Sequence, residues 1–63
     1  MLEYLGIYNQ EHIETHYVRI LANNRESADA KFIQYLEKKD IFVFEDDMMV
    51  IPLFKILELE TIS

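Results

Sequence analysis

One segment, residues 23–40, carries a complete helix signal, with a start, a single apolar face and an end. Asn23 or Asn24 can cap the first turn with its side-chain oxygen, and Glu26 lies three residues after Asn23, which is the spacing of a capping box. Two lysines near the end of the segment, Lys38 and Lys39, suit the negative end of the helix dipole. These signals predict a helix over about residues 25–39.

The apolar residues of this segment fall on one side of a helix. At about 100° per residue the shared sector contains four residues, with Ile33 at its margin: Ala28, Phe32, Tyr35 and Leu36. A helix of this length measures roughly 22 Å, which matches strands of about six residues. Because the segments on either side read as strands, we expect the helix to cover one face of a sheet.

Two strands are predicted before the helix. Residues 2–8 are rich in Tyr, Leu and Ile, and a polar break at residues 9–11 suits a hairpin connection. Residues 12–22 alternate, so that one side of the second strand carries Val18, Ile20 and Ala22 and the other carries Tyr17, Arg19 and Leu21.

A second hairpin is predicted after the helix. The apolar runs 41–44 and 48–53 flank the acidic residues 45–47, and Asp is a common turn residue. Pro52 cannot donate to a central ladder, so it marks an edge position, a bulge or the end of the strand. Residues 56–62 read either as a fifth strand, with Glu58 and Glu60 alternating with leucines, or as a short helix, and the alternation favours the strand.

These elements predict a single α+β domain over residues 1–63. Its sheet would be antiparallel, with four or five strands in the order ββαββ(β), and the one helix would pack on one face. The uncovered face is then expected to be apolar and to need a partner. Its candidate residues are Tyr17, Leu21, Met48, Met49, Leu53 and Phe54.

Composition narrows the classes of partner. A chain of 63 residues without cysteine that is 51% hydrophobic has no disulfides to stabilise it, so we expect surplus apolar surface to be covered in a homodimer. The net charge of −6 and the absence of a basic cluster argue against direct binding of nucleic acid and favour a basic protein partner. No apolar run is long enough to span a membrane and no signal peptide is evident, which predicts a cytoplasmic protein.

Few residues offer chemistry. On a strand, His12, Glu14 and His16 would share one face and could bind zinc, but strand spacing holds the two histidines about 13 Å apart, so a solvated polar strand end is the preferred interpretation. The acids at 45–47 lack the further ligands and glycine of a calcium loop. No catalytic motif or glycine-rich phosphate loop is present, so neither an enzyme nor a cofactor is predicted.

The function expected from these observations is that of a small acidic module that binds another protein. In size, acidity and lack of catalytic motifs the chain resembles, by type only, phage and mobile-element inhibitors that occlude the basic surface of a nucleic-acid-acting enzyme as a DNA mimic does. The alternative is a structural or regulatory homodimeric subunit that binds through its apolar sheet face or an edge strand. The residues expected to bind are Glu45, Asp46, Asp47, Glu58, Glu60, Tyr17 and Met49.

Overall fold

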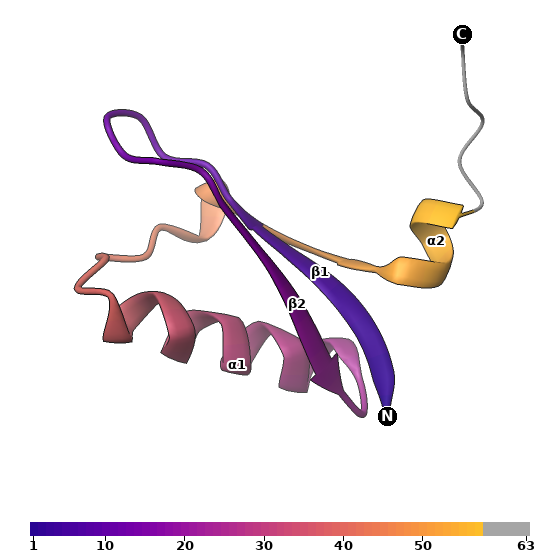
Figure 1. The fold of residues 1–63 in the computed structure, drawn as a ribbon. Helices are drawn as coiled ribbons and strands as arrows, with labels where there is room; N and C mark the ends of the chain where they lie inside the picture. Colours follow the sequence, from indigo (N-terminus) through magenta and orange to yellow (C-terminus); the bar gives the residue numbers. More distant parts are fainter. Residues whose placement is uncertain (58–63) are drawn as a thin grey trace, which may run out of the picture.

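The computed structural model describes residues 1–57 as a three-stranded antiparallel sheet packed against one long helix (Figure 1). The central strand β1 lies between β2 and β3 and is antiparallel to both. A single turn of 3-10 helix precedes β3. In chain order the elements are β1 (Leu2–Tyr8), β2 (His16–Ala22), α1 (Arg25–Lys38), the 3-10 turn (Glu45–Asp47), β3 (Met48–Pro52) and α2 (Leu53–Leu57).

The prediction of a four- or five-stranded sheet in the order ββαββ(β) is wrong, although the broader description as a small α+β fold fits. Segment 41–44 forms no strand, and β3 pairs with β1 along the edge opposite β2. The backbone of segment 41–44 bonds to a side chain: the Tyr8 hydroxyl accepts from the Phe44 amide at 3.0 Å and lies 3.3 Å from the Phe42 carbonyl oxygen. The segment therefore contacts β1 through the Tyr8 side chain without joining the sheet.

Two other boundaries differ from the prediction. The second strand begins at His16 and not at residue 12, because the connection from β1 makes a turn in which His12 has a positive φ of 73°. After β3 the chain enters α2, so the helical alternative is correct for Leu53–Leu57 and the predicted strand at 56–62 is wrong at its start. The rest of that predicted strand lies outside the described residues.

Helix α1 agrees with its prediction and begins and ends with standard capping contacts. Asn24 is the N-cap, and its side-chain oxygen accepts from the Ser27 amide at 2.8 Å. At the other end Asp40 has a φ of 60°, and the amides of Asp40 and Ile41 bond to the carbonyls of Glu37 and Leu36. This pair of bonds is a Schellman motif, which turns the chain away after the last helical residue.

The core lies between α1 and the sheet face that it covers. The predicted apolar stripe is confirmed, with Ala28, Phe32 and Leu36 buried, and these residues meet aromatic and aliphatic side chains of all three strands. The buried strand residues are Tyr4, Tyr8, Ile20, Ala22 and Val50. Gly6 provides the space for the Phe32 ring, because a Cβ at residue 6 would lie only 2.9 Å from that ring.

Candidate functional site

The sheet face opposite α1, here called the open face, carries a continuous apolar row across all three strands. Strand alternation sends Tyr17 of β2, Ile7 of β1 and Met49 of β3 to this side, and the ladder registers place Ile7 beside both of the others. Tyr17 is 70% exposed and Met49 is 53% exposed, whereas Ile7 between them is half-buried. The row therefore presents two exposed anchors over an apolar base.

A second row on the open face is amphipathic. Leu5 lies between Arg19 of β2 and Ile51 of β3 in the ladder registers. The Arg19 guanidinium donates to the carboxylate of Glu3, which lies diagonally across on β1. Because both charges are exposed and paired with each other, this row adds little net charge to the face.

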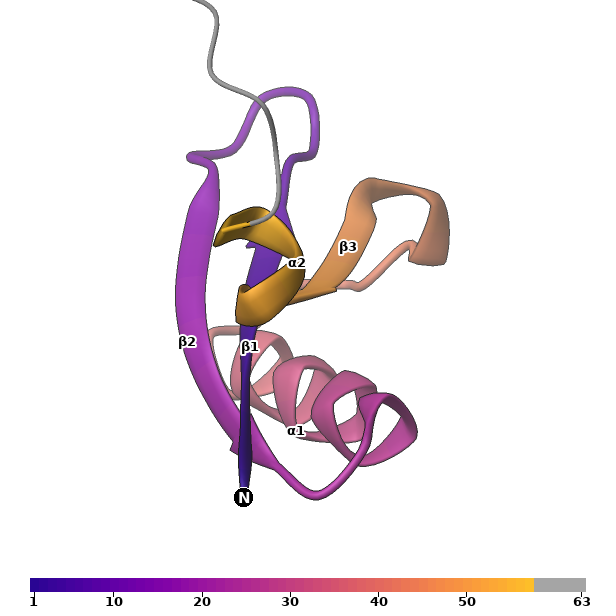
Figure 2. The same cartoon turned by 90° about the vertical axis from the view of Figure 1, so that its right-hand side faces the viewer.

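Helix α2 covers part of the open face. It follows β3 directly, contacts β1 and β3, and lies on the side of the sheet away from α1 (Figure 2). Leu53 is half-buried, while Phe54 remains half exposed. Within the described residues, the row from Tyr17 to Met49 is thus the part of the face that keeps large exposed side chains on both outer strands.

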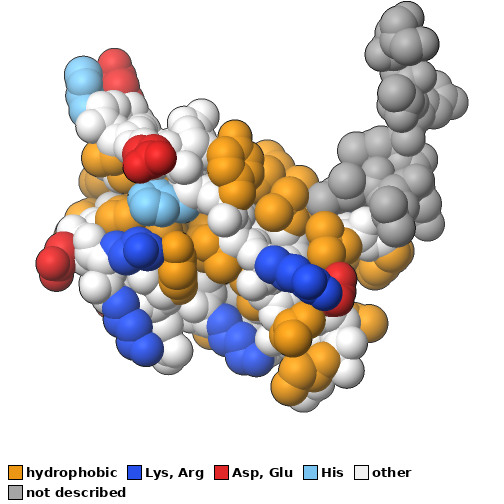
Figure 3. Space-filling view, in the orientation of Figure 1, with side chains coloured by type: hydrophobic (Ala, Val, Ile, Leu, Met, Phe, Trp, Pro, Cys, Tyr) orange, Lys and Arg blue, Asp and Glu red, His pale blue; other side chains and the backbone are white. Residues whose placement is uncertain are grey.

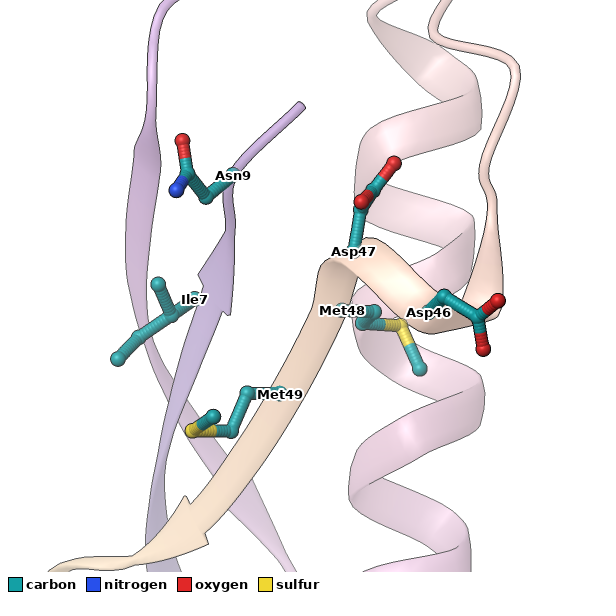
Figure 4. Close-up of a pocket in the computed structure, with 6 residues that line it drawn as sticks. All are labelled: Ile7, Asn9, Asp46, Asp47, Met48 and Met49. Carbon is teal, nitrogen blue, oxygen red and sulfur yellow. The ribbon is translucent and has the colours of Figure 1, made fainter. Parts of the chain in front are cut away.

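An open hollow of about 380 Å³ lies where the open face meets the acidic turn. Its lining includes Ile7, Asn9, Asp46, Asp47, Met48 and Met49. Figure 4 shows the side chains of Ile7 and Met49 on the same side of their strands, while Met48 points to the other side. The hollow has an apolar floor on the open face and a polar margin at the turn.

The acids of the turn do not converge on a common point. The carboxyl groups of Asp46 and Asp47 point in different directions in Figure 4. Glu45 and Asp46 are exposed and Asp47 is half-buried, with its backbone carbonyl accepting from the Asn9 amide at 3.0 Å. The turn is therefore built as a solvated acidic rim and lacks the inward geometry of a cation site.

The histidines and glutamate considered as zinc ligands are not brought together by a strand. His12 and Glu14 precede β2 and lie in the exposed hairpin connection, and His12 contacts Glu11 at 3.7 Å. His16 is the first residue of β2. Within residues 1–57, no three His, Asp or Glu side chains are grouped closely enough to hold a metal ion.

The structure unites some of the predicted binding residues and separates others. Tyr17 and Met49 lie on the open face as predicted, and Met48 does not, because it packs against the core on the α1 side. Ile7, which joins the two exposed anchors, was missed, although the alternation within residues 2–8 was the signal that could have found it. Glu58 and Glu60 lie outside the described residues.

Comparison with protein-family models, with curated protein sequences and with solved structures found no match to this chain. Among the described residues, no helix combines the length and the apolar character needed to cross a membrane. Function is therefore inferred from the open face and its surroundings.

Proposed function

We propose that this protein is a small protein-binding module that contacts its partner through the open face. The observation that supports this proposal is the row of Tyr17, Ile7 and Met49, which places two large exposed side chains on either side of an apolar neighbour on the open face. Tyr and Met are enriched in the cores of protein interfaces, because they offer large and adaptable contact surfaces. Scattered exposed apolar residues need no explanation, but a contiguous row does.

The acidic turn supplies the polar rim of this surface. Residues 45–47 immediately precede β3, and two of them, Asp46 and Asp47, line the same hollow as Met49 at the edge of the row. A partner of matching chemistry places apolar side chains over the row and a lysine or arginine near the turn. The charges then assist the encounter and the register of binding, while the apolar row contributes most of the affinity.

From the sequence, binding through acidic residues was the first expectation and binding through the apolar sheet face was the alternative. The proposal here places the apolar face first. A DNA-mimic inhibitor would need an acidic surface as its main contact, and the carboxyl groups of Asp46 and Asp47 diverge. If the acidic turn makes the main contact, the protein would instead bind by covering a basic surface of an enzyme. The two modes predict opposite sensitivities to salt, since exposed charge pairs are screened at high ionic strength whereas apolar contacts are not.

The test is affinity capture from the source cells with matched variants. We expect Tyr17→Ala and Met49→Ala each to weaken capture of the same partner by about tenfold or more, as for interface anchors that contribute upward of about 1.4 kcal/mol. Phe42→Ala is the matched control, because Phe42 is 79% exposed and lies outside the sheet. Asp46→Asn should weaken capture less, and only at low salt.

Two results would contradict the proposal. One is a partner whose capture is equally affected by Phe42→Ala and Tyr17→Ala, which would indicate nonspecific adhesion. The other is a partner lost with Asp46→Asn and in high salt but retained with both open-face variants, which would assign binding to the acidic rim.

The open face also suits self-association, and one feature of its register favours this second use. Tyr17 and Met49 lie at opposite ends of the row with Ile7 at its centre. A two-fold axis that lies above Ile7 and runs parallel to β1 would place each Tyr17 ring over the Met49 thioether of the other copy, a contact in which sulfur and aromatic groups attract each other. A homodimer formed in this way would occupy the same surface as the partner.

A further inference from the structure

The two edges of the sheet differ in how many backbone groups they leave unpaired, and the ladder pattern shows which groups these are. The Asn9 amide bonds to the Asp47 carbonyl, so odd-numbered residues of β1 point their backbone groups toward β3 and even-numbered ones toward β2. On β2 the residues that face outward are then the odd ones. The Lys31 ammonium confirms this independently, because it donates to the Leu21 carbonyl at 2.6 Å.

The outer edge of β3 is closed by its sequence and by the turn before it. By the same alternation its outward residues are Met48, Val50 and Pro52. The Met48 amide bonds back to the Glu45 carbonyl, and Pro52 has no amide hydrogen. Val50 therefore has the one outward amide of this strand that is not already bonded, and a single amide is too little for a partner strand to pair with.

The outer edge of β2 is open by comparison. Among the described residues no strand lies beyond it, and its outward residues are Tyr17, Arg19 and Leu21. All three residues have an amide hydrogen. The Leu21 carbonyl accepts a hydrogen bond from the Lys31 ammonium. A lysine placed over an edge is a common protection against uncontrolled strand pairing, and a side chain of this kind can move aside when a strand arrives.

The charges around this edge are positive, in contrast to the net charge of the whole chain. Lys38 lies seven residues after Lys31 and so falls on the same side of α1, and Arg19 projects from β2 itself. Glu3 is paired with Arg19. The net charge of the four groups Arg19, Lys31, Lys38 and Glu3 is therefore +2. Figure 3, which looks onto the β2 edge, shows Lys and Arg side chains from the left to the middle of this side, with a carboxylate beside one of them and other carboxylates above and at the left.

We infer that the β2 edge accepts an extended segment of a partner protein that carries acidic side chains, as a fourth strand. The incoming backbone pairs with Tyr17, Arg19 and Leu21, and the Lys31 ammonium exchanges the Leu21 carbonyl for a carboxylate of the added strand. Charge complementarity distinguishes this occupant from a second copy, because pairing two β2 edges about a two-fold axis would bring the positive groups of both copies together. This surface is separate from the Tyr17–Met49 row in its use of backbone groups, and it does not depend on the proposed function.

The test follows amide exchange by NMR in labelled protein with blocked eight-residue peptides as probes. In the free protein we expect the amides of Tyr17, Arg19 and Leu21 to exchange much faster than those of Val18 and Ile20. A peptide that alternates Val and Glu should protect the three outward amides, whereas a Val and Lys peptide should bind about tenfold more weakly or worse. An N-methylated Val and Glu peptide should give no protection, because it cannot complete the ladder.

Two variants at one position separate backbone pairing from charge. Arg19→Gln keeps the backbone amide and should weaken binding of the acidic peptide a few-fold. Arg19→Pro removes an outward amide hydrogen and should abolish binding. Exchange at Val18 and Ile20 in the proline variant reports whether β2 is still paired to β1. If it is not, the N-methylated peptide decides the same point in the unaltered protein.

Three outcomes would overturn the inference. They are equal binding of the acidic and basic peptides, absence of protection by either, and protection of the three outward amides that rises with protein concentration without any peptide, which would assign the edge to a second copy. Met49→Ala is the control that keeps the two proposals apart. It should weaken capture through the open face and leave peptide binding at the β2 edge unchanged, because Met49 lies on β3.

Discussion

At residue 6 the absence of a side chain determines how closely the helix approaches the sheet. A Cβ there would lie 2.8 Å from the Ile20 side chain and 2.9 Å from the Phe32 ring, and both of those residues are buried. Neither neighbour can move into solvent. The requirement is therefore one of space, because no positive φ constrains Gly6.

We predict that Gly6→Ala destabilises the fold by about 1–3 kcal/mol, as overpacked core substitutions do. Urea unfolding followed by circular dichroism would measure the change. Ala30→Gly is a control for the general effect of glycine and alanine, because Ala30 is exposed on α1, and it should cost about 1 kcal/mol through helix propensity alone. A Gly6→Ala variant as stable as the parent would show that α1 does not pack against this point.

At the scale of elements, segment 41–44 shows how one side chain can replace a ladder. The side chains alternate as in a strand, with Ile41 and Val43 packed against the core and Phe42 and Phe44 exposed. The Tyr8 hydroxyl, fully buried, accepts from the Phe44 amide and has both Gln10 Oε1 at 2.9 Å and the Phe42 carbonyl within reach as acceptors. One hydroxyl thus links the end of β1 to the chain that returns from α1.

Tyr8→Phe removes this link while keeping the ring. We expect a loss of about 1–3 kcal/mol, because the Phe44 amide and the Phe42 carbonyl lose a partner in a partly buried place. Amide exchange should accelerate at Phe44 and remain slow in the middle of β1. Tyr4→Phe is the matched control, and uniform acceleration across the sheet would show that the hydroxyl stabilises the whole fold and not this segment.

The elements that sequence predicted well are those whose signals are local. The N-cap at Asn24, the apolar stripe and the alternation of β2 all lie within a few residues of the structure that they specify. The partner of β3 is decided by residues forty or more positions away on β1, and nothing between 41 and 53 distinguishes that pairing from a local hairpin. The alternation of residues 12–16 misled for a local reason, because a turn with a positive φ at His12 precedes β2, which begins only at His16.

For the molecule as a whole, the candidate site was half predictable. Tyr17 and Met49 could be assigned to an uncovered face because exposed aromatic and Met residues exceed what one helix can cover. That they lie on either side of Ile7 could not be predicted, since this depends on β1 lying between β2 and β3. The asymmetry between the closed β3 edge and the open β2 edge likewise arises from strand order and from contacts such as Lys31 to Leu21.

In self-association of the whole molecule, the apolar open face favours contact between two copies and their net charge opposes it. Each copy carries a formal charge of −6, so two copies repel each other at low salt, whereas the contact that would join them is apolar. At about 1 M salt the Debye length is only about 3 Å, and the repulsion is largely screened. Self-association through the open face should therefore strengthen as salt rises, opposite to binding of a basic partner at the acidic rim.

Sedimentation equilibrium at low salt and at about 1 M salt would measure this, starting from the 7.6 kDa monomer. Tyr17→Lys should abolish association at both salt concentrations, because it places a charge within the apolar contact, opposite Met49 of the other copy. Phe42→Lys makes the same change of net charge at an exposed position outside the sheet and should leave association intact or raise it slightly at low salt. A monomer under every condition would leave the open face to a different protein, whereas dimers that weaken with salt would place the contact at charged residues and not at the row.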